Sequence, residues 1–301
     1  MSTSAHFPSV SIVTITKDDP EVAVTVENLL EESRQYPGVS EVLVVDATPG
    51  TPHRVDDSQV RWIAFEPRGM KATIPEQRNV GVAQSAGDVV VFIDSGCVPG
   101  PEWLRRMTAP IRDEGEQIVA GAHAASGRGS IRDHDLDFRG TSEYLREAPT
   151  INLAIVKSVF KTVGGFDESF GYGSDVDFTW RSVASGYRIR HQPSALVSHD
   201  WGATGDDLRR SCVYGQARFK LYAKHPAHRS RVMKDDPIAV LYPLFLLAVV
   251  LSRGDRRVLA TAAVPIVKNL RRRPLLTFAH NVAFGAGVLR GAWRALAPDV
   301  P

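Results

Sequence analysis

A chain of 301 residues, 43% of them apolar and 23% charged, is long enough to bury a core and too apolar to be disordered. Its two cysteines, Cys97 and Cys212, exclude a disulfide framework, and the lack of a Cys-x-x-Cys spacing excludes the common cysteine zinc sites. We therefore expect a reducing, cytoplasmic setting. No basic stretch followed by an apolar one opens the sequence, so we expect no secretory signal.

The net charge of +2 conceals an uneven distribution of charge along the chain. Between Ile238 and Ala297 there are nine Lys or Arg residues and one acid, Asp255, which gives this segment a charge of +8. The other 27 basic and 33 acidic residues leave the rest of the chain at −6. A mildly acidic body therefore carries a basic, apolar tail, and the two parts are expected to have different partners.

The first third of the chain alternates predicted strands and helices. Apolar, β-branched runs predict strands at 10–16, 41–47, 60–66 and 88–94. Helical periodicity covers 20–35, with Pro20 at its start, and 74–87, where Gly87 is expected to end the helix. This alternation predicts an α/β fold with a Rossmann-like, mostly parallel sheet covered on both faces.

The pattern is less regular after Asp94. We expect a strand at 116–124, a polar and mobile loop at 126–140, and a strand, short helix and Gly-Gly turn within 151–170. A helix follows at 174–186, capped by Ser174 or Asp175 and closed by Gly186. Extended chain at 187–200 then leads to a helix containing 208–225 and to the apolar tail.

Two aspartates, Asp46 and Asp94, each end an apolar strand. An aspartate in such a place is commonly a cap or turn residue, but open parallel sheets also bind ligands at the carboxyl ends of their strands. Two such ends in one sheet favour a shared crevice, with a nucleotide as its obvious ligand. The sequence contains neither the Gly-x-Gly-x-x-Gly fingerprint nor a phosphate-binding P-loop, so those glycine loops do not hold it.

Five ordered segments resemble the family 2 inverting glycosyltransferases of GT-A fold. They are VSIVTIT, EVLVVDATPG, EQRNVGVAQSAGDVVVFIDSGCVP, VGGFDESF and GSDVDFTWR, and the resemblance covers residues 8–200. The order and spacing of these five segments carry the resemblance. The resemblance implies an enzyme that moves a sugar from a nucleotide-diphosphate donor to a hydroxyl acceptor with inversion, in glycan, cell-envelope or secondary-metabolite assembly.

The same resemblance assigns residues to the donor. Asp46 matches an aspartate that binds the nucleobase, and Thr14 and Thr16 would line that pocket. Arg78 matches an arginine that approaches the nucleotide, a task that suits the fixed donors of a guanidinium; otherwise it is a surface residue of the helix. The donor base and sugar do not follow from these matches.

Asp94 matches the first aspartate of an Asp-x-Asp motif that holds Mg²⁺ or Mn²⁺ and the diphosphate. This sequence departs from the motif because Gly96 stands where the second aspartate is expected. Three interpretations stay open. Asp94 coordinates a metal with help from His199, the diphosphate supplies most of the ligands, or a cation such as Arg78 or Lys71 replaces the metal. We favour a retained, weaker metal site.

Asp175 matches the general base of the family's Glu-Asp pair, with Ser174 in place of the glutamate. An inverting displacement needs a carboxylate within reach of the acceptor hydroxyl. The alternative interpretation is that Asp175 and Asp177 only favour the start of a helix through its dipole. The two interpretations are compatible, and we expect Asp175 to be catalytic.

The division of the chain follows from these patterns. We expect a catalytic domain at 8–204 and a helical, apolar and basic appendage at 205–297. Its apolar run at 238–251 is too short to span a membrane, and dense arginines beside it favour a helix at an anionic membrane surface, on the inner face of the cell membrane. A packed helical subdomain or a dimer surface is the alternative. Nucleic acid is not an expected partner, because aromatic residues are sparse among the basic ones.

Two other functions remain compatible with the sequence. A nucleotide-sugar-binding protein that has lost catalysis would explain Gly96 and Ser174. A nucleotidyltransferase would use a related sheet, but the activating loop expected after its first strand is absent. A lipid-linked saccharide is a candidate acceptor if the tail lies on a membrane.

Overall fold

The computed structural model describes the chain except for residues 1–5, 51–53, 127–141, 201–203, 262–273 and 297–301. The described residues form two compact units, of which the first ends at Asp200 and the second begins at residue 204. Most of the loop expected at 126–140 lies outside the described residues.

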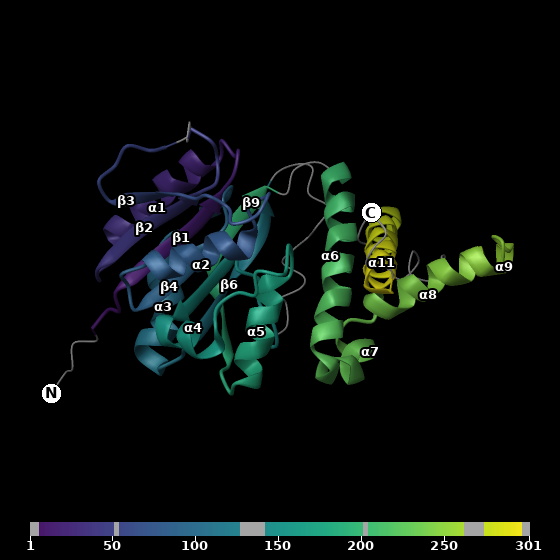
Figure 1. The fold of residues 1–301 in the computed structure, drawn as a ribbon. Coiled ribbons are helices and arrows are strands. Elements are labelled where there is room, and N and C mark those ends of the chain that lie inside the picture. The colour runs from purple at the N-terminus through teal and green to yellow at the C-terminus, as the bar shows by residue number, and fades with distance from the viewer. Residues whose placement is uncertain (1–5, 51–53, 127–141, 201–203, 262–273, 297–301) are drawn as a thin grey trace. The chain divides into compact units, whose positions relative to one another are not determined.

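The first unit is built on one nine-stranded sheet, ordered β3-β2-β1-β4-β8-β6-β9-β5, with β7 paired to β9 (Figure 1). Four parallel strands form one half of it: β1 (Val10–Thr16), β2 (Ser40–Asp46), β3 (Val60–Ala64) and β4 (Val89–Ile93). Every residue of β4 is buried, as the continuous apolar run predicts for a strand covered on both faces.

The other half of the sheet mixes strand directions. It contains β5 (Cys97–Pro99), β6 (Ile118–Ser126), β7 (Tyr144–Leu145), β8 (Asn152–Val156) and β9 (Ile189–Asp200). β8 runs antiparallel between β4 and β6, whereas β6 and β9 are parallel. The predicted α/β class with a mostly parallel central sheet is confirmed.

Five helices accompany this sheet: α1 (Val22–Gln35), α2 (Ile74–Gln84), α3 (Trp103–Glu114), α4 (Lys157–Val163) and α5 (Ser174–Ala184). The predicted end of α2 at Gly87 is wrong, since the helix ends at Gln84. Gly87 serves a packing purpose instead: a Cβ there would lie 2.6 Å from the backbone nitrogen of Ser11. Only glycine permits this close approach to β1.

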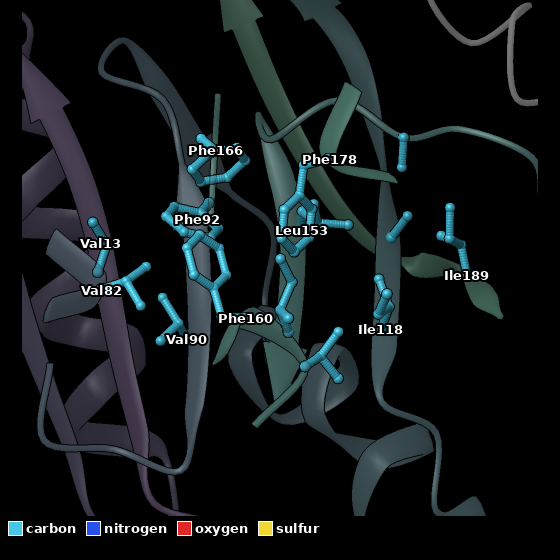
Figure 2. Close-up of a cluster of buried hydrophobic side chains, with 14 of the residues drawn as sticks. Val13, Val82, Val90, Phe92, Ile118, Leu153, Phe160, Phe166, Phe178 and Ile189 are labelled. Carbon is cyan, nitrogen blue, oxygen red and sulfur yellow. The ribbon is translucent and has the colours of Figure 1, made fainter. Parts of the chain in front are cut away.

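An aromatic cluster fills the core between the sheet and α2, α4 and α5 (Figure 2). The ring of Phe178 in α5 lies 4.8 Å from that of Phe160 and 5.1 Å from that of Phe166, and Phe166 lies 5.4 Å from Phe92 in β4. Burial of such large rings is a major source of stability. Because Phe92 precedes the end of β4 and Phe178 lies in the first turns of α5, the cluster fixes these two elements relative to each other.

The second unit is helical. It comprises α6 (Thr204–Lys224), η2 (Pro226–Arg231), α7 (Val232–Asp235), α8 (Ile238–Leu251), α9 (Arg256–Ala260) and α11 (Pro274–Leu296). α6 and α11 pack backbone to backbone, because a Cβ at Gly215 would clash with the carbonyl oxygen of Phe284 and one at Gly287 with that of Cys212. Among the described residues, no helix combines the length and apolarity needed to cross a bilayer.

Candidate active site

Three predicted donor residues share one face of the sheet at the carboxyl ends of β1 and β2. Val13 and Val45 approach Gly81 of α2, so the alternate residues Thr14, Thr16 and Asp46 lie on the opposite face. Thr16 and Asp46 are register partners, and both are buried. The structure thus brings these three residues together on one face of the sheet.

The polar atoms on this face are unevenly satisfied. An oxygen of Asp46 accepts a hydrogen bond of 2.8 Å from the backbone N–H of Thr48, which orients the carboxylate. The buried hydroxyls of Thr14 and Thr16 have no hydrogen-bond partner in the part of the chain that the structure describes. Unsatisfied buried hydroxyls are unusual and are compatible with contacts to a ligand.

A second group of residues forms around Arg78 of α2. Its guanidinium Nη2 lies 2.6 Å from an oxygen of Asp94, just beyond β4. The Arg78 side chain is only 6% exposed, whereas that of Asp94 is 37% exposed. The buried arginine therefore holds in place a carboxylate that remains accessible.

The position of α2 depends on two neighbours of Arg78. Gly81 has no side chain where a Cβ would clash with Val13 of β1. The amide nitrogen of Gln77 donates hydrogen bonds of 3.0 Å to the backbone oxygens of Thr16 and Val45. Gln77 ties α2 to the carboxyl ends of β1 and β2. We did not predict this role, and no sequence signal separates Gln77 from a surface glutamine.

Asp175 lies in the first turn of α5 and belongs electrostatically to the same group. Burial raises the pKa of Asp175; the positive charge of Arg78 acts to lower this pKa, and the negative charge of Asp94 acts to raise it. An oxygen of Asp175 accepts a hydrogen bond of 2.8 Å from the N–H of Val176. The structure therefore places the candidate base within the influence of both Arg78 and Asp94.

The predicted cap of α5 is wrong. Gly173, with φ of 82°, is the N-cap residue, and neither Ser174 nor Asp175 occupies the cap position. The left-handed conformation suits glycine, and the carboxylate of Asp175 instead accepts from the N–H of Val176 within the first turn. Asp177 is fully buried and pairs with Arg181 at 2.9 Å, so its role is structural.

The turn after Asp94 explains how Gly96 fits. Gly96 has a φ of 81°, which glycine adopts without strain. His199 on β9 pairs with Cys97 of β5, and its Nε2 lies 3.5 Å from where a Cβ at position 96 would be. The His199 imidazole thus lies beside the position where the motif has its second aspartate.

The residues available for a metal are few. Among the described residues, no group of three or more His, Cys, Asp and Glu side chains could hold a metal ion. Asp94 and His199 offer one carboxylate and one imidazole in the same region. Cys97 is buried, and burial together with the nearby Asp94 raises the pKa of its thiol, which favours a packing role for this residue. The site fits only a metal whose other ligands come from a bound diphosphate.

Lys71, the other cation that could replace the metal, is exposed in the segment between β3 and α2. Trp180 and Arg181 of α5 make internal hydrogen bonds: the Trp180 N–H donates to Glu147 at 2.9 Å, and the Arg181 guanidinium donates to the backbone oxygen of Val163.

Comparisons with solved structures define the class of the fold. The chain resembles the mannosyltransferase PcManGT from Pyrobaculum calidifontis, solved with GDP-Man and Mn²⁺, with a TM-score of 0.71 and 17% identity over 96% of this chain and 88% of that one. GalNAc-T7 with UDP, GalNAc and Mn²⁺ matches with a TM-score of 0.55 and 14% identity over 73% of this chain and 51% of that one. The fold is the GT-A fold.

The sequence comparisons name the family. The model of glycosyl transferase family 2 matches residues 9–166, and the chain belongs to this family. It is 28% identical over 232 residues to the pre-mycofactocin glycosyltransferase of Mycobacterium tuberculosis, covering 72% of this chain and 49% of that one. Glycosyltransferase AglE of Haloferax volcanii is 26% identical over 152 residues, which are 48% of this chain and 50% of AglE. The chain spans about half the length of these curated relatives.

Proposed function

We propose that the chain is an inverting glycosyltransferase that moves one sugar from a nucleotide-diphosphate donor to a hydroxyl acceptor. The observation that carries this proposal is the group formed by Asp94, Arg78 and Asp175 at the carboxyl edge of the sheet. It combines an accessible carboxylate, a buried cation and a candidate base. Family membership and the donors named for the two solved neighbours support it.

The donor would occupy the strand ends. Asp46 would accept a hydrogen bond from an N–H of the base, and the buried hydroxyls of Thr14 and Thr16 would find partners in the same pocket. Arg78 would favour binding of the diphosphate through its charge while it orients Asp94. Thr14, Thr16 and Asp46 lie toward the carboxyl ends of β1 and β2, and Arg78 of α2 pairs with Asp94 just beyond β4, which supports these roles.

Asp175 would act on the acceptor. Its carboxylate takes the proton of the acceptor hydroxyl as the hydroxyl oxygen bonds to the anomeric carbon. The bond between that carbon and the diphosphate oxygen breaks, and attack from the opposite side inverts the configuration. The products are a glycoside, with the proton on Asp175, and a free nucleoside diphosphate.

A divalent metal, Mg²⁺ or Mn²⁺, is part of the proposal. It would neutralise charge that develops on the leaving diphosphate. Asp94 and His199 would hold it, with the diphosphate supplying further oxygens, because the described residues offer no larger group of ligands here. The two solved neighbours were obtained with Mn²⁺.

The composition of the C-terminal tail bears on the acceptor and on the location. A lipid-linked saccharide at the cytoplasmic face of the cell membrane fits a chain with a basic, apolar tail, because anionic lipids are abundant in that leaflet. The relative RfbC of Myxococcus xanthus, an O-antigen biosynthesis protein 28% identical over 214 residues, supports assembly of a polysaccharide as the setting.

Product analysis tests the activity. Incubation with UDP-, GDP- and dTDP-sugars should release a nucleoside diphosphate; pyrophosphate would indicate a nucleotidyltransferase, and no turnover of any donor would indicate an inactive binding protein. Asp175→Asn should lower kcat by about 10²- to 10⁴-fold with little change in donor affinity. Asp113→Asn, at an exposed carboxylate on α3, is the matched control and should keep full activity. Normal turnover by Asp175→Asn would remove Asp175 from the mechanism.

A further inference from the structure

Helix α8 is apolar on all sides, but the rest of its unit covers only one of them. Tyr242 and Pro243 are buried against α11, where a Cβ at Gly285 would lie only 2.7 Å from the Cβ of Tyr242. The rings of Tyr242 and Phe245 lie 6.0 Å and 5.9 Å from that of Phe278. These contacts anchor the inner side of α8 to α11.

The other side of α8 is an exposed apolar surface. Leu241, Leu244 and Leu247 are 50%, 57% and 43% exposed, and Val250 and Leu251 are 74% and 81% exposed. At 3.6 residues per turn, Leu244, Leu247 and Leu251 lie on one side of the helix, and Leu241 and Val250 lie at the two margins of that side. A contiguous apolar surface of this kind marks a site of interaction with another molecule or with a membrane.

Three arginines continue this surface beyond the end of α8. Arg253, Arg256 and Arg257 are exposed, and within the described residues none of them forms an ion pair with a carboxylate. The only acid among them, Asp255, caps α9 by accepting a hydrogen bond of 2.7 Å from the backbone N–H of Arg257. The guanidinium groups are therefore available to an anionic partner.

We propose that this surface docks the chain on a lipid bilayer that contains anionic lipids. The α8–α9 surface consists of Leu241, Leu244, Leu247, Val250, Leu251, Arg253, Arg256 and Arg257. Its apolar side chains would enter the boundary between headgroups and acyl chains, and its arginines would contact lipid phosphates. The complementarity of charge, and apolar side chains directly beside free guanidinium groups, favour this occupant. The proposal does not depend on the glycosyl transfer proposed above.

Cosedimentation with vesicles tests it. The full chain should sediment with vesicles of phosphatidylcholine and phosphatidylglycerol at low salt, and much less with phosphatidylcholine alone. Leu244→Ser/Leu247→Ser should weaken binding at least about tenfold. Substitution of Arg253, Arg256 and Arg257 by Glu should weaken vesicle binding by about fivefold per residue or more. Added salt should abolish the difference in binding between this variant and the unchanged chain. Met70→Ser, at a fully exposed apolar side chain of the first unit, is the control and should bind like the unchanged chain.

Several outcomes would overturn the proposal. Absence of binding to anionic vesicles at low salt would do so, as would unchanged binding by the α8 variant. If the chain does not bind vesicles but forms a dimer, and Leu244→Ser/Leu247→Ser dissociates that dimer, the α8–α9 surface would instead be occupied by a second copy of the chain. Circular dichroism checks that each variant folds. Donor turnover in solution is measured on the same samples, so loss of turnover with intact vesicle binding would contradict the proposed function and leave the docking surface standing.

Discussion

The carboxyl group of Asp175 lies among groups that act on its pKa in opposite directions. Burial is the largest influence and raises the pKa, and the Asp94 carboxylate acts in the same direction, whereas the Arg78 guanidinium opposes both. A base that must accept a proton from a hydroxyl benefits from a raised pKa, provided that it remains deprotonated at the working pH. Arg78 thus affects two carboxylates: it pairs with Asp94 directly and acts on the pKa of Asp175 through its charge.

This environment predicts how stability depends on pH. Because the folded-state pKa of Asp175 lies above its ordinary value of 3.8, the folded chain binds the proton more tightly than the unfolded chain. The contribution of this carboxyl to the free energy of unfolding therefore falls as the pH rises from about the unfolded pKa through the folded pKa. Asp175→Asn removes the titration, so it should raise the Tm more at neutral pH than at a pH near the ordinary value of 3.8. Thermal unfolding of the unchanged chain and of Asp175→Asn, measured between these two pH values, checks this prediction. A Tm difference that does not depend on pH would contradict the raised pKa.

At the scale of elements, the approach of α2 to the sheet determines where Arg78 lies. Gly81 permits this approach, and Gln77 fixes it through two backbone carbonyls. Asn79 holds the other side of α2 by accepting from the N–H of Phe166 and donating to its carbonyl oxygen, both at 2.9 Å. The helix is therefore fastened both to the strand ends and to the segment that leads into α5.

A methyl group at position 81 tests this dependence. Gly81→Ala would place a Cβ against Val13, so α2 should shift outward, with a loss of about 1–3 kcal/mol of stability and weaker donor binding. Gly69→Ala adds the same methyl group where nothing lies within 4 Å, and it should leave stability and donor affinity unchanged or slightly improved. Denaturant unfolding and donor titration measure both effects. Equal behaviour of the two variants would mean that the packing of α2 does not position Arg78.

The sequence predicted the elements better than their contacts. β1, β2 and β4 were predictable because strands buried on both faces are continuous apolar runs, and Asp46 and Asp94 followed from the ends of those runs. The antiparallel direction of β8 was not predictable, because the sequence of a buried strand is a continuous apolar run whether the strand runs parallel or antiparallel to its neighbours. The start of α5 at Ser174 was predictable, but its cap was predicted wrongly, since a side-chain cap and a glycine in the left-handed conformation compete at the same place. The pairing of Arg78 with Asp94 depends on tertiary approach and has no local signal.

At the scale of the whole molecule, the chain combines a sheet unit that carries the candidate site and a helical unit with an exposed apolar and basic surface. The glycine contacts of α6 with α11 show that part of the apolar tail is internal packing, as the alternative of a packed helical subdomain expected. The exposed side of α8 is not covered by the packing of these helices. The proposed membrane docking and the helical packing therefore involve different sides of the same segment.

The central claim is that the carboxyl edge of the sheet is a nucleotide-sugar donor site. Calorimetric titration with UDP, GDP and dTDP, with and without Mn²⁺, tests it most directly on the unchanged chain and on Asp94→Ala. We predict that one nucleotide binds, that Mn²⁺ tightens its binding, and that Asp94→Ala abolishes the effect of the metal. Tight binding that is indifferent to Mn²⁺ and to Asp94 would show a metal-free donor site. Failure of all three nucleotides to bind would contradict the claim.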